Sequence, residues 1–256
     1  MRGFGIDATV SPEVAAEVAV LVEENGYASF WVNGSPPDGA LDILEQAAAH
    51  TDLDLGVGVF ALPNISAEDL VAEVQRRELP QDRLWLGVGS NRKPGALAEV
   101  RAATDTLRSD LDVHVVTAAV GPKMTALAAE VAESVIFTWW FVPEVERSRA
   151  LLEQSAAEVD QTPPTVISYI RCALLPQAAD AVAERAEAYG AIPRYAEMFA
   201  RNGVSAADTV VAGASRAELL PGIERESAVL DVPVIRAIPA ADTVEGLSEL
   251  VIACAP

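Results

Sequence analysis

Short apolar runs alternate along this chain with longer segments in which apolar residues recur every three or four positions. Runs rich in valine, isoleucine, leucine and aromatic residues are typical of buried strands, and the longer spacing is typical of amphipathic helices. Eight runs of the strand type are each followed by a segment of the helix type. The predicted strands cover residues 3–9, 28–32, 53–59, 83–88, 113–117, 134–138, 165–170 and 232–238.

Several of the predicted helices carry end signals in the sequence. Ser11 followed by Pro12 predicts an N-cap and a proline in the first turn, and Ser66 predicts a second N-cap. Asn25 and Gly26 predict a helix end in which the glycine adopts a left-handed conformation. These signals bound the first helix at both ends and fix where the third helix begins.

The predicted strands recur at intervals of roughly 20 to 30 residues, which is typical of repeated strand–helix units. We therefore expect a (β/α)8 barrel. An open, doubly wound parallel sheet is the alternative, because the number of strands alone does not demonstrate closure. The longer interval between residues 170 and 232 predicts a helical excursion before the eighth strand. No proline- or serine-rich linker interrupts the pattern, so residues 1–256 are expected to form a single domain.

Charge and composition narrow the classes of partner. The chain carries 38 acidic residues against 18 lysines and arginines, a formal net charge of -20. Nucleic acids and anionic membranes need basic surfaces, so neither is an expected partner. The sequence has no apolar stretch of the roughly 20 residues that a membrane helix requires, and its first residues do not resemble a signal peptide. We expect a soluble, cytoplasmic protein.

The segment 118–124, with the sequence AAVGPKM, is the most informative local signal for a ligand. It joins a predicted strand to a predicted helix, whose first turn offers free N–H groups and the positive end of the helix dipole to an anion. Gly121 allows a close approach to the backbone, Pro122 suits the first helical position, and Lys123 adds a positive charge. A phosphate site is one interpretation, and an ordinary helix start with a surface lysine is the other.

A barrel of this kind binds its ligands at the carboxyl ends of its strands. The residues predicted there are Asp7, Thr9, Asn33, Gly34, Val59, Phe60, Ser90, Asn91, the segment 118–124, Trp139, Trp140, Tyr169, Arg171 and Arg236. The adjacent Trp139 and Trp140 have flat faces that suit a fused-ring cofactor or an apolar substrate, although structural packing explains them equally well. Arg92 and Lys93 are candidates for meeting an anionic tail.

Histidine and cysteine are too sparse for the common metal and triad chemistries. His50 and His114 fall at a helix end and at the start of a strand, so both are expected to be structural. Zinc-dependent barrel hydrolases need several histidine ligands, and no G-x-S-x-G sequence marks a nucleophilic serine. Cys172 and Cys254 lack the spacing of a metal site, so no metal is expected. The glycines of 56–61 match a relaxed dinucleotide-binding pattern, but they lie within a strand, where that pattern does not bind nucleotides.

Several segments, in the right order, resemble the luciferase-like monooxygenase superfamily. They are 15–17 (AAE) and 24–32 (ENGYASFWV), 84–90 (LWLGVGS), 118–124 with 127–130 (LAAE), and 189–195 (YGAIPRY) with Asn202 and Gly203. The closer likeness is to the oxidoreductases of that superfamily that use the deazaflavin coenzyme F420.

The resemblance implies a cytoplasmic, usually homodimeric (β/α)8 barrel that binds a flavin or deazaflavin at its strand ends. The implied activity is that of an oxidoreductase or monooxygenase, here transferring a hydride between the cofactor and a small, mostly apolar organic substrate. FMN, with a separate reductase partner, is the alternative to coenzyme F420. A peptide bulge is implied near Val59 and Phe60. The implied cofactor-binding residues are Asn33, Val59, Phe60, Ser90, Ala119, Gly121, Pro122, Lys123, Met124 and Trp139.

The chain departs from the family at the usual positions of proton donors. Family members often carry a histidine or an acid after the second strand and a histidine after the fourth, where this chain has Asn33 and Ser90. Asp7 and Tyr169 are therefore the expected catalytic residues, as replacement proton donors, with water as another source. The same departures leave open a non-catalytic barrel that binds a cofactor or supports a partner subunit.

Overall fold

The structure is a computed structural model that describes residues 2–91, 93–139 and 141–256. Its strands are β1 (Gly3–Ile6), β2 (Ser29–Gly34), β3 (Asp54–Ala61), β4 (Leu84–Gly89), β5 (His114–Ala118), β6 (Ser134–Phe137), β7 (Thr165–Leu174), β8 (Val211–Gly213) and β9 (Val232–Ala237). Its helices are α1 (Pro12–Glu24), α2 (Pro37–His50), α3 (Ala67–Arg76), α4 (Ala96–Asp110), α5 (Pro122–Val131), α6 (Val142–Glu158), α7 (Ala179–Gly190), α8 (Pro193–Asn202), α9 (Arg216–Ser227) and α10 (Val244–Ala253).

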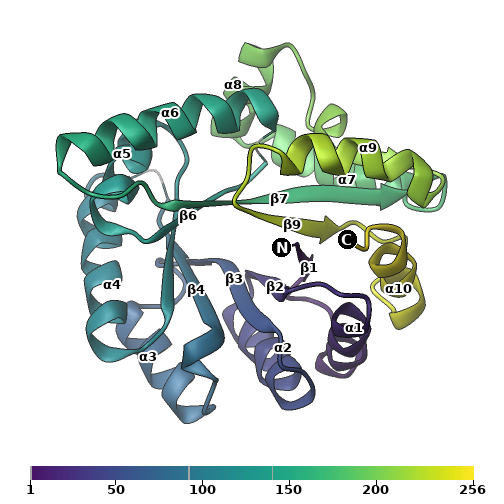
Figure 1. Ribbon diagram of the computed structural model, residues 1–256, viewed down its shortest axis with the longest axis horizontal. Coiled ribbons are helices and arrows are strands. Elements are labelled where there is room, and N and C mark those ends of the chain that lie inside the picture. Colours follow the sequence, from purple (N-terminus) through teal and green to yellow (C-terminus); the bar gives the residue numbers. More distant parts are fainter. Residues whose placement is uncertain (1, 92, 140) are drawn as a thin grey trace.

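Eight parallel strands close into a barrel with helices around it (Figure 1). The strands follow one another from β1 to β7, and β9 joins β7 to β1, so the ring has no free edge. This closure confirms the predicted (β/α)8 barrel and rules out the open doubly wound sheet. The short strand β8 lies outside the ring and pairs with the end of β7. Sequence reasoning predicted only helical structure in this region and missed β8, because three residues give no periodicity to read.

The helix boundaries follow the predicted end signals. The Ser11 hydroxyl oxygen accepts a hydrogen bond from the Val14 N–H at 3.4 Å, and the Ser66 hydroxyl oxygen accepts one from the Asp69 N–H at 3.0 Å. Gly26 has φ +80°, the left-handed conformation expected of a residue that ends a helix. Local sequence therefore fixes where the outer helices begin and end.

Trp31 fills the lower part of the barrel interior. It is fully buried, and its indole N–H donates to the Ser29 hydroxyl at 2.8 Å. A Cβ on Gly56 would lie 2.3 Å from the indole ring, and one on Gly3 would lie 3.0 Å from it. Gly56, which formally matched a dinucleotide-binding pattern, thus makes room for a tryptophan, and Gly58 of the same pattern makes room for Ile136 and Tyr169. These glycines serve the packing of the barrel interior.

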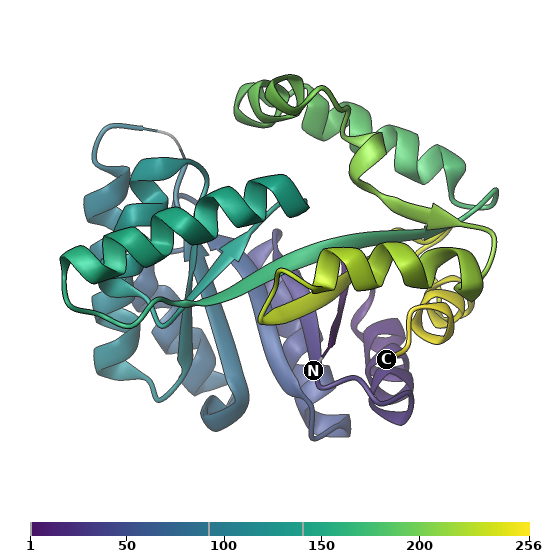
Figure 2. The same cartoon turned by 45° about the horizontal axis from the view of Figure 1, so that its top comes forward.

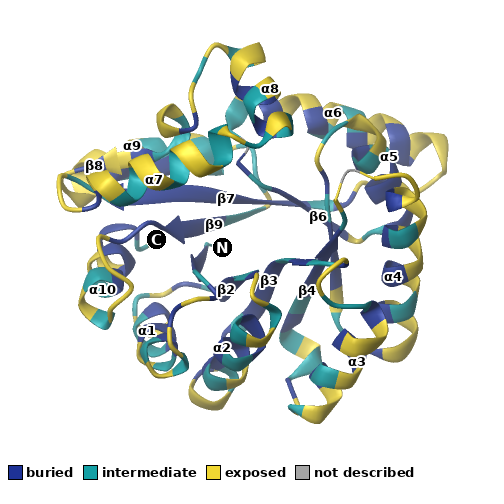
Figure 3. Cartoon of the chain, turned by 180° about the vertical axis from the view of Figure 1, so that it is seen from behind, coloured by how far each residue is buried: buried dark blue, intermediate teal, exposed yellow. Residues whose placement is uncertain are grey.

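The second layer of the core lies between the barrel and its helices. Strand residues whose side chains point outward are fully buried there, as alternation along each strand requires, and the strands appear buried in Figure 3. Examples from five strands are Phe4, Phe30, Val57, Phe60, Leu86 and Ile170. No helix in the described part of the chain combines the length and the apolar character needed to cross a bilayer.

The excursion before the last barrel strand consists of α7 and α8, which project from the barrel in Figure 2. None of the residues of α7 is buried, whereas Tyr195, Met198 and Phe199 of α8 are. These α8 side chains pack in a cluster with Trp139, which follows β6. Aromatic contacts of α8 with Trp139, the Arg185–Asp7 ion pair of α7 and the Arg201–Glu144 ion pair of α8 therefore join the excursion to the barrel.

Candidate active site

A cavity of about 940 Å³ opens at the carboxyl ends of β3, β4, β5 and β6. The segments before and at the start of α4 and α5 form one side, and Arg194, Tyr195 and Glu197 of α8 form the other. The cavity thus lies where strand–helix loops of a (β/α)8 barrel place their ligand sites. A volume of this size is in the range of pockets that hold large organic cofactors.

The end of β3 contributes apolar residues, Val59 and Ala61, to the lining of the cavity, and we call this surface its floor. The pairing of β3 with both neighbours shifts register between Val57 and Phe60, and the peptide bond between Gly58 and Val59 is cis. The Val59 side chain packs over β4, since a Cβ on Gly87 would lie 2.8 Å from one of its methyl groups. A Cβ on Gly89 would meet the other methyl group at 3.2 Å. The bulge and the two glycines together let Val59 line the cavity.

The turn before α5 has the geometry of an anion site. Gly121 is the N-cap residue, with φ +91° and ψ 163°, a conformation open to glycine and strained for other residues. Pro122 follows as the first helical residue, so the first free N–H groups of the helix belong to Lys123 and Met124. No atom lies within 4 Å of the point where a Cβ of Gly121 would be, so a ligand can reach the backbone. These residues suit a phosphate group.

Among the described residues, three cationic side chains line the cavity, and they differ in whether a carboxylate pairs with them. Lys93 forms an ion pair with Glu99 at 3.0 Å, and Ser90 donates a hydrogen bond to the same carboxylate. These contacts, the Ser90 hydrogen bond first, lower the pKa of Glu99. Lys123 is exposed, Arg194 is half-buried, and neither makes an ion pair within the described residues. The charge of Lys123 is therefore available to a ligand.

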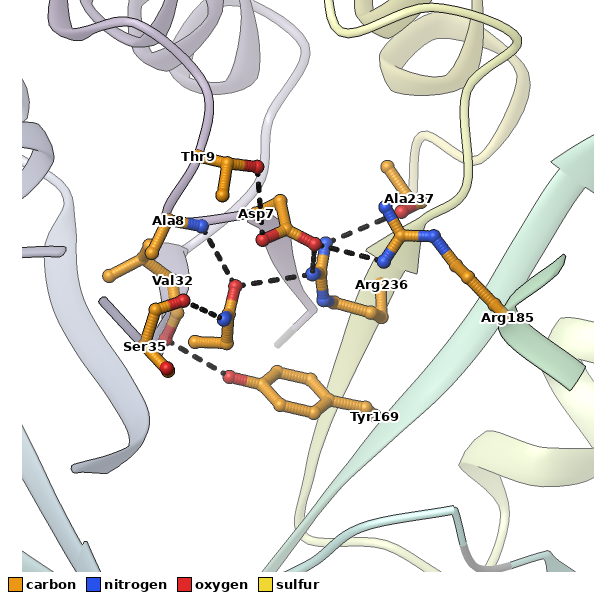
Figure 4. Close-up of polar contacts among 10 residues, drawn as sticks. Asp7, Ala8, Thr9, Val32, Ser35, Tyr169, Arg185, Arg236 and Ala237 are labelled. Carbon is orange, nitrogen blue, oxygen red and sulfur yellow. Dashed lines mark hydrogen bonds and ion pairs between the residues drawn. The ribbon is translucent and has the colours of Figure 1, made fainter. Parts of the chain in front are cut away.

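A separate polar network lies at the ends of β1, β2 and β9 (Figure 4). The Asp7 carboxylate accepts hydrogen bonds from Arg236 at 2.8 Å and from Arg185 of α7 at 2.9 Å. The Asn33 side-chain oxygen accepts from Arg236 at 3.2 Å and from the Ala8 N–H at 2.8 Å. Burial alone would raise the pKa of Asp7, but the two guanidinium groups outweigh it and hold that pKa below its usual value. Asp7 is therefore ionised at neutral pH.

Arg171, on β7, lies face-on against an aromatic ring instead of a carboxylate. Its guanidinium carbon is 3.8 Å from the centre of the Trp139 ring and 5.8 Å from that of Tyr189. Trp139 is itself buried, with the Tyr189 ring 4.7 Å away. Burial is the main cause that lowers the pKa of Arg171, to about 9. Arg171 remains largely protonated at neutral pH and is held in place by aromatic packing.

Tyr169 lies inside the barrel, one inward-facing position below Arg171. Its hydroxyl donates to the Val32 carbonyl at 3.3 Å, and a Cβ on Gly58 would lie 2.5 Å from the hydroxyl oxygen. Burial raises the pKa of this tyrosine. Tyr169 is therefore neutral at ordinary pH and sits directly beneath the bulge that supports Val59.

The structure divides the predicted site residues among several places. Val59, Ser90, Gly121, Pro122, Lys123 and Met124 line the cavity. Asp7 and Asn33 belong to the arginine network, and Tyr169 lies within the barrel. Phe60, Ala119 and Trp139 are buried in the apolar clusters between the strands and the helices. The predictions for Arg92 and Trp140 fall on positions outside the described residues.

Sequence reasoning missed the contributions of the excursion. Arg194, Tyr195 and Glu197 reach the cavity, and Arg185 reaches Asp7, yet no spacing in the sequence places α7 and α8 over these strands. The segment 189–195 in the family resemblance was the one signal that pointed to this region.

Both histidines are far from the cavity, as predicted. A ring nitrogen of His50 lies 2.7 Å from the Gln46 carbonyl at the end of α2. His114, the first residue of β5, stacks on Trp85 with ring centres 4.6 Å apart. Within the described residues, no three histidine, cysteine or acidic side chains are grouped as metal ligands. Backbone N–H groups and cationic side chains are therefore the groups of the cavity that could act on a bound ligand.

Several solved structures share this fold over almost the whole chain. An F420-dependent secondary alcohol dehydrogenase, in complex with an F420–acetone adduct, matches with a TM-score of 0.74 and 15% identity, covering 98% of this chain and 97% of that one. The coenzyme F420-dependent tetrahydromethanopterin reductase of Methanopyrus kandleri matches with a TM-score of 0.69 and 16% identity, covering 99% and 97%.

A third structure extends the comparison to a flavin enzyme. The oxygenating constituent of the 3,6-diketocamphane monooxygenase of Pseudomonas putida, in complex with FMN, matches with a TM-score of 0.63 and 11% identity, covering 100% of this chain and 98% of that one. No protein-family model matches the sequence, and no curated protein matches it. At these identities the likeness is one of fold, and the fold is the luciferase-like (β/α)8 barrel.

Proposed function

We propose, from the luciferase-like barrel and the geometry of its cavity, that this protein is a flavin- or deazaflavin-dependent oxidoreductase. The proposed reaction transfers a hydride between the cofactor and a small organic substrate. The observation that carries the proposal is the combination of two features on one cavity. The first is the glycine turn before α5, with a lysine that makes no ion pair among the described residues, and the second is the apolar floor that includes Val59. Solved structures of the same fold bind coenzyme F420 or FMN, and both of these cofactors contain a phosphate and a fused ring.

The residues present fit such a cofactor. Its phosphate would accept hydrogen bonds from the N–H groups of Lys123 and Met124, and the Lys123 ammonium group would neutralise part of its charge. Its ring system would lie over Val59, with Gly89 and Ala118 beside it. When bound, the cofactor supplies the hydride or accepts it, and the protein contributes position and electrostatics.

The two predicted catalytic residues differ in how well each could serve as a proton donor. Asp7 is held ionised by Arg236 and Arg185, so it has no proton to give at neutral pH. Tyr169 is neutral and lies beneath the cavity floor. We therefore assign Asp7 the role of positioning the two arginines and keep Tyr169 as the proposed proton donor.

Several finer features of the proposal rest on the family resemblance. These are a homodimeric state, a cytoplasmic location, and a reductase partner if the cofactor is FMN. The two cofactors lead to different chemistry: a deazaflavin restricts the enzyme to two-electron hydride transfer, whereas FMN also permits activation of oxygen. The cavity offers anchors for the phosphate common to both.

A second candidate is a non-catalytic barrel that binds the cofactor without turning over a substrate. The observation that favours it is the position of His50 and His114, which leaves the cavity without a histidine to move protons. A panel of aldehydes, ketones and enones, offered with reduced cofactor, separates the two candidates. Steady turnover of any member excludes the non-catalytic barrel, and tight binding without turnover supports it.

The proposal is tested by titrating the purified protein with coenzyme F420 and, separately, with FMN, and following cofactor fluorescence. The variant Lys123→Ala should bind the preferred cofactor about tenfold more weakly, the loss of roughly 1.4 kcal/mol expected for one charge-assisted contact. Lys93→Ala is the matched control: it lines the same cavity, but its charge is already paired with Glu99. Equal affinities for Lys123→Ala and the unmodified protein would remove Lys123 from the site, and binding of neither cofactor would overturn the proposal.

A further inference from the structure

The side of the barrel mouth opposite the glycine turn carries buried positive charge. Arg171 on β7 and Arg236 on β9 are register partners in neighbouring strands, and each is 7% exposed. Arg185 of α7 adds a third guanidinium group at the same end of the barrel. Asp7 is the one carboxylate that pairs with any of the three among the described residues, and it is shared between Arg185 and Arg236. Two positive charges therefore remain in excess.

Of these three arginines, Arg171 is the one without an anionic partner among the described residues. It makes no hydrogen bond or ion pair with any residue that the structure describes. The groups that act on it electrostatically are the hydroxyls of Tyr169, Tyr189 and Tyr195 and the like charge of Arg236. The Trp139 ring packs against the flat face of the Arg171 guanidinium group. The N–H donors on the edges of the guanidinium plane are therefore able to bind another partner.

A buried, unpaired guanidinium group is costly, and proteins normally neutralise it with a carboxylate. This chain has 38 acidic residues and a net charge of -20, so an acidic partner was abundantly available. Arg171 instead lies against the Trp139 ring, with the Tyr189 ring 5.8 Å from its guanidinium carbon. Aromatic packing fixes the direction of the guanidinium group without neutralising it, an arrangement suited to a site that must receive an anion from outside.

We propose that Arg171 binds an anionic oxygen group of the substrate, a carboxylate or a phosphate, with Arg236 beside it. The inference rests on the proposed function and sharpens it: the substrate becomes an organic anion whose apolar part faces the cofactor ring. A guanidinium edge matches the two oxygens of such a group in a bidentate contact. The cofactor phosphate is assigned to the turn before α5. The cofactor phosphate and the anionic group of the substrate would therefore bind at the ends of different strands.

The test uses the full-length protein without cofactor and follows binding by calorimetry. The probes are a series of monocarboxylates from acetate to benzoate, each paired with its neutral amide, together with phenyl phosphate. We expect at least one anion to bind about tenfold or more tightly than its neutral counterpart. Arg171→Gln should abolish this preference, and Arg171→Lys should retain part of it. If the unmodified protein prefers no anion over its amide, the inference is wrong.

Two controls separate a lost site from a lost fold. Arg108→Gln removes an exposed arginine that pairs with Glu133, and it should leave the preference for anions unchanged. Arg171→Gln removes an unpaired buried charge, so its melting temperature should not fall below that of Arg108→Gln by more than a few degrees. If Arg171→Gln does unfold, the comparison of Arg171→Lys with the unmodified protein still decides whether the anion preference depends on this side chain.

A second titration distinguishes the source of the anion. Coenzyme F420 and FMN should bind Arg171→Gln as tightly as they bind the unmodified protein. If cofactor affinity falls about tenfold while the small anions are unaffected, Arg171 meets the cofactor and the assignment to substrate is overturned. Failure of both cofactors to bind would overturn the proposed function alone, because the small-anion titration needs no cofactor.

Discussion

The two sides of the barrel mouth are built in opposite ways. On the side of β3 to β6, the ligand surface includes backbone, glycine and valine, and Lys123, which makes no ion pair among the described residues, is exposed. On the side of β7, β9 and β1, the surface is made of long charged side chains, and Arg171 and Arg236 are almost completely buried. The cation of the first side therefore lies at the surface, whereas the arginines of the second side are part of the core.

This difference suits the two ligands that we assign to the mouth. A cofactor phosphate needs N–H groups at the start of a helix, and these come from a continuous stretch of chain. A varied organic anion needs side chains that converge from several strands and are held rigidly by their neighbours. We therefore expect loss of the Asp7 carboxylate, which pairs with two arginines, to cost stability, and substitutions on the glycine side to cost chiefly cofactor affinity.

The largest effect is expected for Asp7→Asn. This change leaves Arg236 and Arg185 without their shared carboxylate, and removing one partner of a buried ion pair costs about 3 kcal/mol. Denaturant unfolding measures the loss. The matched control is Glu133→Gln, whose exposed pair with Arg108 should contribute only about 0.5 kcal/mol or less. A loss for Asp7→Asn no greater than for Glu133→Gln would show that the arginine side is not part of the stable core.

The same variant should change the pH dependence of stability. The pKa of Asp7 is lowered in the folded protein, so its contribution is complete above the unfolded pKa of about 3.9 and is lost as the pH falls through the folded value. The difference in free energy of unfolding between the two proteins should therefore be constant near neutral pH and should shrink in acid. A difference that grows as the pH falls would contradict the lowered pKa.

A smaller effect on stability is expected for Gly121→Ala, together with a clear loss of cofactor affinity. At φ +91° and ψ 163° an alanine is strained by about 2 kcal/mol, and its methyl group would occupy the space left for the phosphate. Gly190→Ala is the control, because Gly190 ends α7 without a left-handed φ and with open space around it. Unchanged cofactor affinity in Gly121→Ala would place the phosphate elsewhere.

The smallest effect is expected for His114→Ala. This residue is exposed and stacks on Trp85 at the start of β5, so its loss should cost about 0.5 kcal/mol and leave turnover unchanged. His50→Ala should behave in the same way, since His50 only contacts the carbonyl of Gln46. A marked loss of turnover in either variant would mean that a histidine does take part in the chemistry.

The two sides of the mouth also differed in how well the sequence predicted them. The turn of Gly121 and Lys123 lies within a few consecutive residues, so helix-end rules were enough to predict its shape and its open charge. The barrel itself was predictable for the same reason, because each strand–helix unit repeats a local pattern. The sequence did not predict that Trp31 fills the barrel interior or that glycines make room for its ring, because both depend on tertiary packing.

The arginine side could not be assembled from the sequence. Asp7, Arg171 and Arg236 were each predicted at strand ends, but which of them pair depends on register between strands that are far apart in the chain. Arg185, which pairs with Asp7, lies on α7, and no local sequence rule predicts the position of that helix. That Arg171 is the arginine left without a partner follows only from the three-dimensional arrangement.

The most direct test of this two-sided mouth is a crystal structure of the protein with its preferred cofactor, coenzyme F420 or FMN. We expect the cofactor phosphate within hydrogen-bond distance of the Lys123 and Met124 N–H groups, the ring against Val59, and Arg171 free of contact with the cofactor. A cofactor phosphate bound to Arg171 or Arg236 would contradict the account, because one side of the mouth would then serve the ligand assigned to the other.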